Sequence, residues 1–115
     1  MIILVCGGRK YNQRESVFTA LDKLHKKHQI TLLIHGDCKG ADKLGETWAK
    51  TRGVHYAAVP ALWDIYGPSA GSLRNQIMLL INPKIVVAFP GNNGTRHMTS
   101  VAESQGVKIW RPEDG

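Results

Sequence analysis

Three glycine-rich segments of the chain have the composition of phosphate-binding turns: Gly7-Gly8-Arg9, Gly36 to Ala41 and Pro90 to Thr95. Each leads from an apolar run toward a segment typical of a helix. Unpaired backbone N–H groups and the positive end of the helix dipole attract anions there, and glycine lets a phosphate approach the backbone closely. Together the segments predict one anion-binding site. Its ligand residues from these segments are Gly7, Gly8, Arg9, Gly36, Gly40, Pro90, Gly91, Gly94 and Thr95.

Two arginines are the predicted cationic ligands of this site. The guanidinium groups of Arg9 and Arg74 could each form two parallel hydrogen bonds to a phosphate, and Asn75 directly follows Arg74 as a further ligand candidate. The alternative for either arginine is an ordinary ion pair with an acidic side chain.

Two acidic residues, Asp42 and Glu46, are four positions apart and so share one face of a predicted helix. This spacing would direct Asp42 at the anion site and place Glu46 one turn further along the helix. With Arg74, either carboxylate could serve as the acidic group of a reaction. Alternatively, Asp42 only complements the helix dipole, and Glu46 is solvated or paired with Lys43 or Lys50.

The segment from Pro60 to Gly71 is long for a connection between a strand and a helix, at about twelve residues. It contains Trp63 and Tyr66, which argue against disorder. We expect Trp63 or Tyr66 to stack on a nucleobase, or else to pack against the core.

The sequence lacks the residue patterns of several other kinds of functional site. Gly7-Gly8-Arg9 does not have the glycine spacing of a dinucleotide fingerprint, and neither later glycine segment places a lysine as a phosphate-binding P-loop does. The five histidines have no cysteine or histidine partner at the spacing of a metal site, and no G-x-S-x-G nucleophile elbow occurs. We therefore expect no bound metal and no cofactor.

The elements that would position these residues alternate along the chain. Apolar, β-favouring runs predict five strands, at residues 2–6, 31–35, 54–59, 85–89 and 107–110. Amphipathic or capped segments predict helices around residues 17–28 and at 41–52, 72–81 and 95–105. This order predicts an α/β fold, a single Rossmann-like three-layer domain with a five-stranded parallel sheet. Because ligands bind beyond the carboxyl ends of such strands, the glycine segments should meet at one edge.

The length and composition of the chain indicate its domain number, the charge of its partners and its location. The 115 residues suit one domain, residues 1–115, and the net charge of +6 favours an anionic partner, either a phosphate compound or a nucleic acid. No apolar run is long enough to cross a membrane and no signal peptide is recognisable, so a cytoplasmic location without membrane contact is expected. There, Cys6 and Cys38 should be buried, reduced thiols.

Four ordered motifs resemble the YspA-like branch of the SLOG superfamily, the Rossmann-like group that includes the LOG and DprA families. They are GGRKYNQ, HGDCKGADKLGETWAKTRG, PALWDIYGPSAGSLRNQIML and FPGNNGT, and the resemblance extends from about residue 2 to residue 110. It implies a SLOG-like nucleotide-binding domain with a nucleotide or nucleotide-derived ligand, which several relatives sense. It also implies a homodimer, although the sequence does not identify the interface.

The last motif departs from the LOG pattern PGGxGTxxE, with which that family hydrolyses the N-glycosidic bond of nucleoside monophosphates. Arg74 matches the LOG arginine, but Asn92 replaces the second glycine and Met98 stands at the position of the catalytic glutamate. A thioether can neither transfer a proton nor stabilise an oxocarbenium-like centre. The departure favours binding without that reaction. The alternatives are an N-glycosidase or phosphoribohydrolase that uses Asp42 or Glu46, and nucleic-acid binding, suggested by the charge and the distant likeness to DprA.

Overall fold

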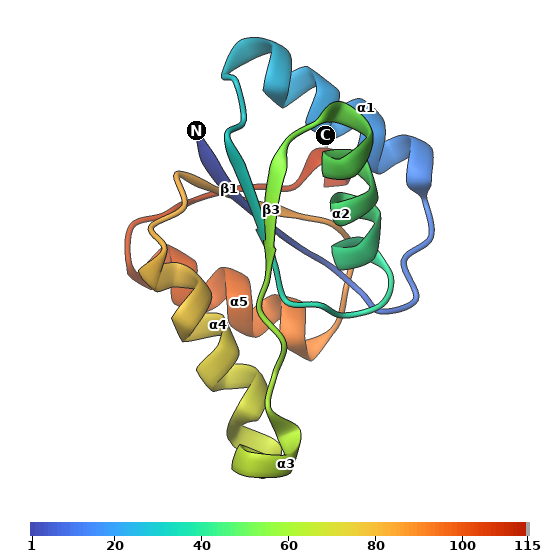
Figure 1. Ribbon diagram of the computed structural model, residues 1–115. Coiled ribbons are helices and arrows are strands. Elements are labelled where there is room, and N and C mark those ends of the chain that lie inside the picture. Colours follow the sequence, from blue (N-terminus) through green and yellow to red (C-terminus); the bar gives the residue numbers. More distant parts are fainter. Residues whose placement is uncertain (115) are drawn as a thin grey trace.

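Five parallel strands form the centre of the protein in a computed structural model that describes residues 1–114 (Figure 1). The strands are β1 (Ile2–Cys6), β2 (Leu32–His35), β3 (His55–Ala58), β4 (Ile85–Ala88) and β5 (Lys108–Trp110). Their order in the sheet is β3-β2-β1-β4-β5, and every neighbouring pair is parallel. The predicted α/β fold with one parallel sheet is confirmed.

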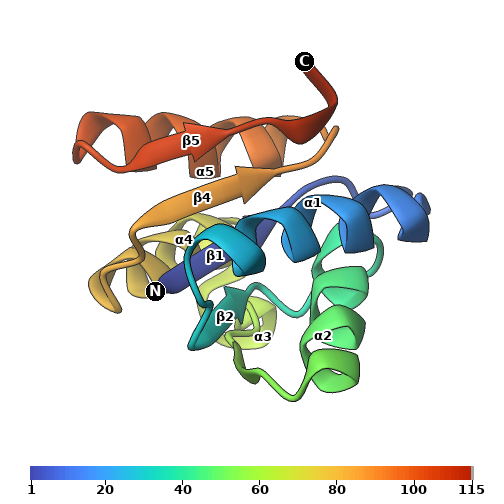
Figure 2. The same ribbon diagram turned by 90° about the horizontal axis from the view of Figure 1, so that it is seen from above.

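Helices cover both faces of this sheet (Figure 2). They are α1 (Arg14–Lys27), α2 (Ala41–Arg52), α3 (Trp63–Tyr66), α4 (Ala70–Leu80) and α5 (Asn93–Ser104), with short 3-10 turns at Gly67–Ser69 and Pro112–Asp114. Helices α1 and α2 pack on one face, and α4 and α5 pack on the other. Within residues 1–114, no helix combines the length and apolar character that crossing a bilayer would need.

Two apolar clusters, one on each side of the sheet, form the core. Alternate residues of β1 point to opposite faces, so that Val5 packs with Trp48 of α2 while Leu4 packs with Met98 of α5. All four residues of β4 are buried, as the continuous apolar sequence of this strand predicts.

The direction of chain progression across the sheet reverses at β1. The chain passes from β1 through β2 to β3 on one side, and then returns to place β4 on the other side of β1. In such a sheet, ligands bind beyond the carboxyl ends of the strands at the point of reversal. The segments that follow β1, β2 and β4 are those that contain the glycines.

The connection between β3 and α4 differs from the predicted loop. Residues Trp63–Tyr66 form α3 and Gly67–Ser69 form a 3-10 turn, and α4 begins at Ala70 rather than at residue 72. Pro68 suits the start of such a turn because its fixed φ angle is already helical. The indole of Trp63 packs over Gly71, where a Cβ atom would lie 3.2 Å from the ring.

Candidate functional site

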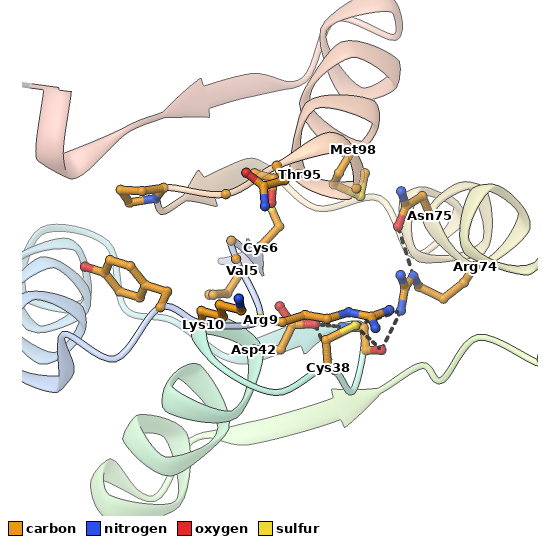
Figure 3. Close-up of a pocket in the computed structure, with 18 of the residues that line it drawn as sticks. Val5, Cys6, Arg9, Lys10, Cys38, Asp42, Arg74, Asn75, Thr95 and Met98 are labelled. Carbon is orange, nitrogen blue, oxygen red and sulfur yellow. Dashed lines mark hydrogen bonds between the residues drawn. The ribbon is translucent and has the colours of Figure 1, made fainter.

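A cavity of about 630 Å³ opens at the carboxyl ends of β1, β2 and β4 (Figure 3). Its volume lies in the range of roughly 300–1,000 Å³ that is common for small-molecule sites. Eleven predicted site residues line it: Gly7, Gly8, Arg9, Gly36, Asp42, Arg74, Asn75, Pro90, Gly91, Gly94 and Thr95. The sheet therefore brings together segments that are distant in sequence.

Gly8 holds three of the rim segments together through its backbone. Its N–H donates to the carbonyl of Pro90 at 2.8 Å, and its carbonyl accepts from the N–H groups of Tyr11 and Ala41, both at 3.2 Å. Gly40 fits closely against this turn, with a φ of 79° and no space for a Cβ atom beside the Gly8 carbonyl. Close packing of backbones, rather than space for a ligand, explains glycine at positions 8 and 40.

In the glycine segments after β1 and β2, some of the backbone N–H groups that were predicted to be free have protein acceptors. The N–H of Gly8 is bonded to Pro90, and the N–H groups of Gly36 and Cys38 donate to the Asp42 carboxylate at 2.9 and 3.3 Å. Protein acceptors compete with a ligand for the same donors, and here they occupy these three N–H groups.

The start of α5 is different, because its donors remain available. No side chain caps this helix, and the N–H groups of Gly94 and Thr95 have no protein acceptor within residues 1–114. Gly94 lines the cavity, and a Cβ atom built there meets no atom within 4 Å. By contrast, a Cβ at Gly91 would overlap the Thr95 hydroxyl and lie 2.7 Å from the Gly8 nitrogen. An anion can approach the first turn of α5 directly.

Arg74 reaches the cavity from α4 and is held by polar contacts on two of its three guanidinium nitrogens. Nε donates to Asn75 Oδ1 at 2.9 Å, and Nη1 donates to the Gly36 carbonyl at 2.5 Å and lies 3.7 Å from Cys38 Sγ. Asn75, which is buried, in turn donates from Nδ2 to His97 Nδ1 at 2.9 Å. These contacts leave Nη2 free of protein partners among residues 1–114 and fix the direction of the guanidinium.

Asp42 carries the one carboxylate among the residues that line the cavity. Burial raises the pKa of this carboxyl above its ordinary value, while hydrogen bonds from Cys38 and Gly36 and the charges of His35 and Arg74 oppose the shift in part. Burial and the charge of Asp42 likewise raise the pKa of the Cys6 thiol, which stays protonated. Both groups therefore lose their protons at a higher pH than the free side chains do.

Positive charge predominates around the cavity. Arg9 and Lys10 are exposed on the segment after β1, and neither forms an ion pair within the described part of the chain. Figure 3 shows the side chains of Arg9 and Arg74 approaching each other from opposite sides of the opening. Among the residues that line the cavity, the largely buried Asp42 is the only acidic one, so the lining carries a net positive charge that suits an anion.

Comparison with known proteins identifies the family. A family model described as "YspA, cpYpsA-related SLOG family" (YAcAr) matches residues 1–66, which is more than half of the chain. The chain belongs to this family. The Gene 61 protein of Mycobacterium phage D29 is 33% identical in an alignment that covers 93% of this chain and 92% of that protein.

A solved structure supports the fold of this SLOG family member. The structure of DNA processing protein A (DprA) from Streptococcus pneumoniae superposes with a TM-score of 0.74 over 93% of the chain, at 16% sequence identity. The chain spans about half of that protein, 48% of its length. At this identity the likeness concerns the fold.

The last of the four motifs, FPGNNGT, and the residues that follow it contribute to the cavity lining. Asn92, Gly94 and Thr95 line it at the start of α5, and Met98 lines it one turn further. Met98 is buried and packs with the core cluster between α4 and α5. A buried thioether thus occupies the position where the LOG pattern has a glutamate.

Three predicted site residues do not line the cavity: Gly40, Glu46 and Trp63. Gly40 lies behind the rim, against Gly8. The Glu46 carboxylate is bonded to His35 Nε2 at 2.9 Å and to Lys50 at 3.3 Å, so the ion pair with Lys50 that the spacing allowed is the one that forms. Trp63 is half exposed on α3.

The structure also adds cavity residues that the sequence analysis did not select as ligands, among them the polar residues Lys10, Tyr11, Cys38 and Asn92. Cys38 is only partly buried, so the prediction of a buried thiol is wrong for Cys38 and right for Cys6. Lys10, Tyr11 and Cys38 lie within three residues of Gly8 or Gly36 in the sequence, and this closeness could have indicated that they line the cavity.

Among residues 1–114, one group of potential metal ligands lies outside the cavity. Ligand atoms of His35, Asp37 and Glu46 lie within 4.8 Å of one another. Each already has a partner, however, because His35 Nδ1 accepts from the Asp37 N–H while Nε2 donates to Glu46, and Lys43 and Lys50 neutralise the two carboxylates. Two adjacent ammonium groups disfavour a cation here.

Proposed function

We propose that the cavity binds the phosphate group of a nucleotide or of a nucleotide-derived ligand. The observation that carries this proposal is that the uncapped first turn of α5 and the free Nη2 of Arg74 face one cavity at the point of sheet reversal. The N–H groups of Gly94 and Thr95 would donate to phosphate oxygens, and Arg74 with Arg9 would neutralise their charge.

The remaining polar group of the cavity suits the rest of such a ligand. Asp42 lines the cavity, and its carboxylate could accept hydrogen bonds from the hydroxyl groups of a sugar. A nucleoside phosphate offers both the anion and the hydroxyl groups that this set of side chains would recognise.

Isothermal titration calorimetry with AMP, CMP, ADP-ribose and inorganic phosphate tests the proposal. We expect heat of binding with wild type and at least about tenfold weaker affinity in Arg74→Gln, because a hydrogen bond to a charged group contributes about 1.5–3 kcal/mol. The matched control is Lys23→Gln, which removes an exposed cation on α1. Absence of heat at millimolar concentrations of all four compounds would refute the proposal.

Hydrolysis of the N-glycosidic bond is the second candidate, favoured by the placement of Asp42 and Arg74 on the same cavity. A carboxyl whose pKa is raised by burial can hold a proton for transfer to a leaving group. Chromatography after incubation with AMP or CMP would detect a released base, and Asp42→Asn should abolish its release. Binding without release would leave the protein a receptor for the nucleotide.

Nucleic-acid binding is a weaker alternative. The S. pneumoniae structure is named a DNA processing protein, and Arg9, Lys10 and Lys39 are exposed near the rim. A gel shift with single-stranded DNA that weakens steeply with salt would support it.

We also expect the protein to act in the cytoplasm, where its two free thiols would stay reduced. Fractionation of expressing cells tests this location.

A further inference from the structure

Tyr11 is the one aromatic side chain among residues 1–114 that lines the cavity. It lies in the segment after β1, two residues beyond Arg9, and it is partly buried. Trp63 and Tyr66, from which stacking on a nucleobase was expected, are exposed on α3 and do not line the cavity. A ligand in the cavity that contains an aromatic ring can therefore meet an aromatic partner at Tyr11.

The ring of Tyr11 is held by two contacts with the rest of the fold. It stacks on the ring of Phe89, directly after β4, with 5.4 Å between the ring centroids and 29° between the planes. The Tyr11 hydroxyl donates a hydrogen bond to the carboxylate of Glu113, in the 3-10 turn near the end of the chain. Burial and this hydrogen bond raise the pKa of Tyr11 to about 12, so the hydroxyl keeps the proton that it donates. A ring that is already fixed loses little conformational freedom when a ligand stacks on it.

Tyr11 offers a base more surface than the aliphatic residues of the lining do. Val5, Met78 and Met98 also line the cavity, but each is at most 2% exposed because it packs in the core. Pro90 is exposed but has no aromatic ring. Every nucleobase has a π face that can stack on an aromatic side chain, whereas a sugar phosphate has none. Contact with Tyr11 would therefore distinguish a nucleotide from a sugar phosphate.

We propose that Tyr11 binds the nucleobase of the ligand by stacking, and that it makes the cavity selective for nucleotides over sugar phosphates. This inference rests on the proposed function, in which the phosphate lies at Arg74 and the first turn of α5. Figure 3 shows Lys10, the neighbour of Tyr11 in the chain, and Arg74 on opposite sides of the opening. A nucleotide with its phosphate at Arg74 would thus extend across the cavity, with its base toward Tyr11.

Calorimetry with AMP and with ribose 5-phosphate tests the proposal, because the two ligands share the sugar and the phosphate and differ in the base. We expect wild type to bind AMP about tenfold more tightly than ribose 5-phosphate, since stacking on one aromatic ring usually contributes a factor of this order. Tyr11→Leu should remove this preference and leave the affinity for ribose 5-phosphate at its wild-type value. Tyr11→Phe, which keeps the ring, should retain the preference.

Tyr56→Leu is the matched control, because Tyr56 is exposed on β3 and does not line the cavity. It should leave both affinities unchanged. Equal wild-type affinities for AMP and ribose 5-phosphate would overturn the role of Tyr11 and leave phosphate binding intact. The same holds if Tyr11→Leu keeps the preference, or if Tyr11→Phe loses it. A wild-type protein that binds neither ligand would overturn the proposed function, and this inference with it.

An NMR measurement on wild type keeps the proposal falsifiable if Tyr11→Leu folds poorly. The chain has three tyrosines, Tyr11, Tyr56 and Tyr66, so ring-labelled tyrosine gives few signals, which Tyr11→Phe and Tyr56→Leu assign. AMP should shift the ring protons of Tyr11 upfield through the ring current of the adenine, and ribose 5-phosphate should not. A Tyr11 signal that does not respond to saturating AMP would overturn the proposal, as would an upfield shift of Tyr66 in its place.

Discussion

Arg74 shows how a side chain can be fixed by its neighbours and still keep one nitrogen, Nη2, without a protein partner among residues 1–114. Its contacts to Asn75 and to the Gly36 carbonyl use Nε and Nη1, which fixes the plane of the guanidinium. A lysine has no such planar fork and would contribute charge without direction. The hydrogen bond from Asn75 to His97 extends this support from α4 to α5.

Position 42 gives a prediction at the same scale. Because burial raises the pKa of Asp42, the folded state holds its proton more readily than the unfolded state. The resulting stabilisation is complete below the ordinary pKa of about 4 and is lost as the pH rises through the raised pKa. Asp42→Asn, which keeps an oxygen acceptor for the Gly36 and Cys38 N–H groups, should therefore unfold at higher urea than wild type at pH 7.

Urea unfolding of both proteins at pH 3.5, 5 and 7 measures this difference. The advantage of Asp42→Asn should decrease as the pH falls, because the wild-type carboxyl then becomes protonated. A difference that is constant across the series would contradict the burial argument.

Several residues show what the sequence could not decide. Glu46 had two compatible placements on α2, one at the cavity and one beside Lys50, and the choice depends on His35 Nε2, which comes from β2. Likewise, free N–H groups at Gly36 and Cys38 could not be distinguished in the sequence from N–H groups capped by Asp42. Such choices depend on three-dimensional neighbours, whereas the selection of Arg74 and Gly94 needed only their local motifs.

At the scale of elements, the start of α5 and the turn before it can be separated by experiment. Gly91→Ala would force a Cβ atom against Thr95 and Gly8, and we expect it to lower the free energy of unfolding by about 1–3 kcal/mol. Gly94→Ala meets open space inside a helix and should raise that energy by up to about 1 kcal/mol.

The two variants should also differ in binding. If a phosphate contacts the first turn of α5, then the added methyl group of Gly94→Ala should weaken AMP binding at least tenfold in calorimetry, although the variant is at least as stable as wild type. Unchanged affinity in Gly94→Ala would place the anion elsewhere in the cavity.

The boundaries of helices and strands could be predicted from the sequence where a local signal, such as a terminal glycine or an unbroken apolar run, marks them. The predicted range 41–52 for α2 is confirmed because Gly53 ends the helix with a φ of 70°, and β1 is confirmed because its residues are apolar in an unbroken run. Residues 63–66 were missed as α3, since a helix of one turn has too few residues for a periodic signal. Its indole rests on Gly71, a contact that the sequence does not reveal.

At the scale of the whole molecule, one polar group joins the two helices on the same face of the sheet. Asp22 of α1 accepts hydrogen bonds from Arg52 and from Trp48 of α2, all at 2.8 Å. The bonds from Arg52, together with that from Trp48, lower the pKa of Asp22 to about 2. The ionised carboxylate thus helps to hold the α1–α2 layer together.

This lowered pKa predicts a pH profile for unfolding. The contribution of Asp22 is present above the ordinary carboxyl pKa of about 4 and is lost as the pH falls through about 2. Because the ion pair is partly exposed, Asp22→Asn should cost only about 1 kcal/mol at pH 7, and the difference from wild type should shrink toward pH 2.5.

Denaturant unfolding at pH 7, 4 and 2.5 checks this profile. Asp64→Asn is the control, because Asp64 is exposed and forms no ion pair within residues 1–114. Equal losses for both variants at pH 7 would show that the bridge between α1 and α2 adds nothing.

The three backbone hydrogen bonds at Gly8 have a kinetic consequence. They join the segments that follow β1, β2 and β4 in the absence of a ligand, so that these segments need not become ordered before a ligand binds. The association of AMP, measured by stopped-flow mixing, should then follow a single phase. Its observed rate should rise linearly with AMP concentration, without the plateau that a slow isomerisation would impose.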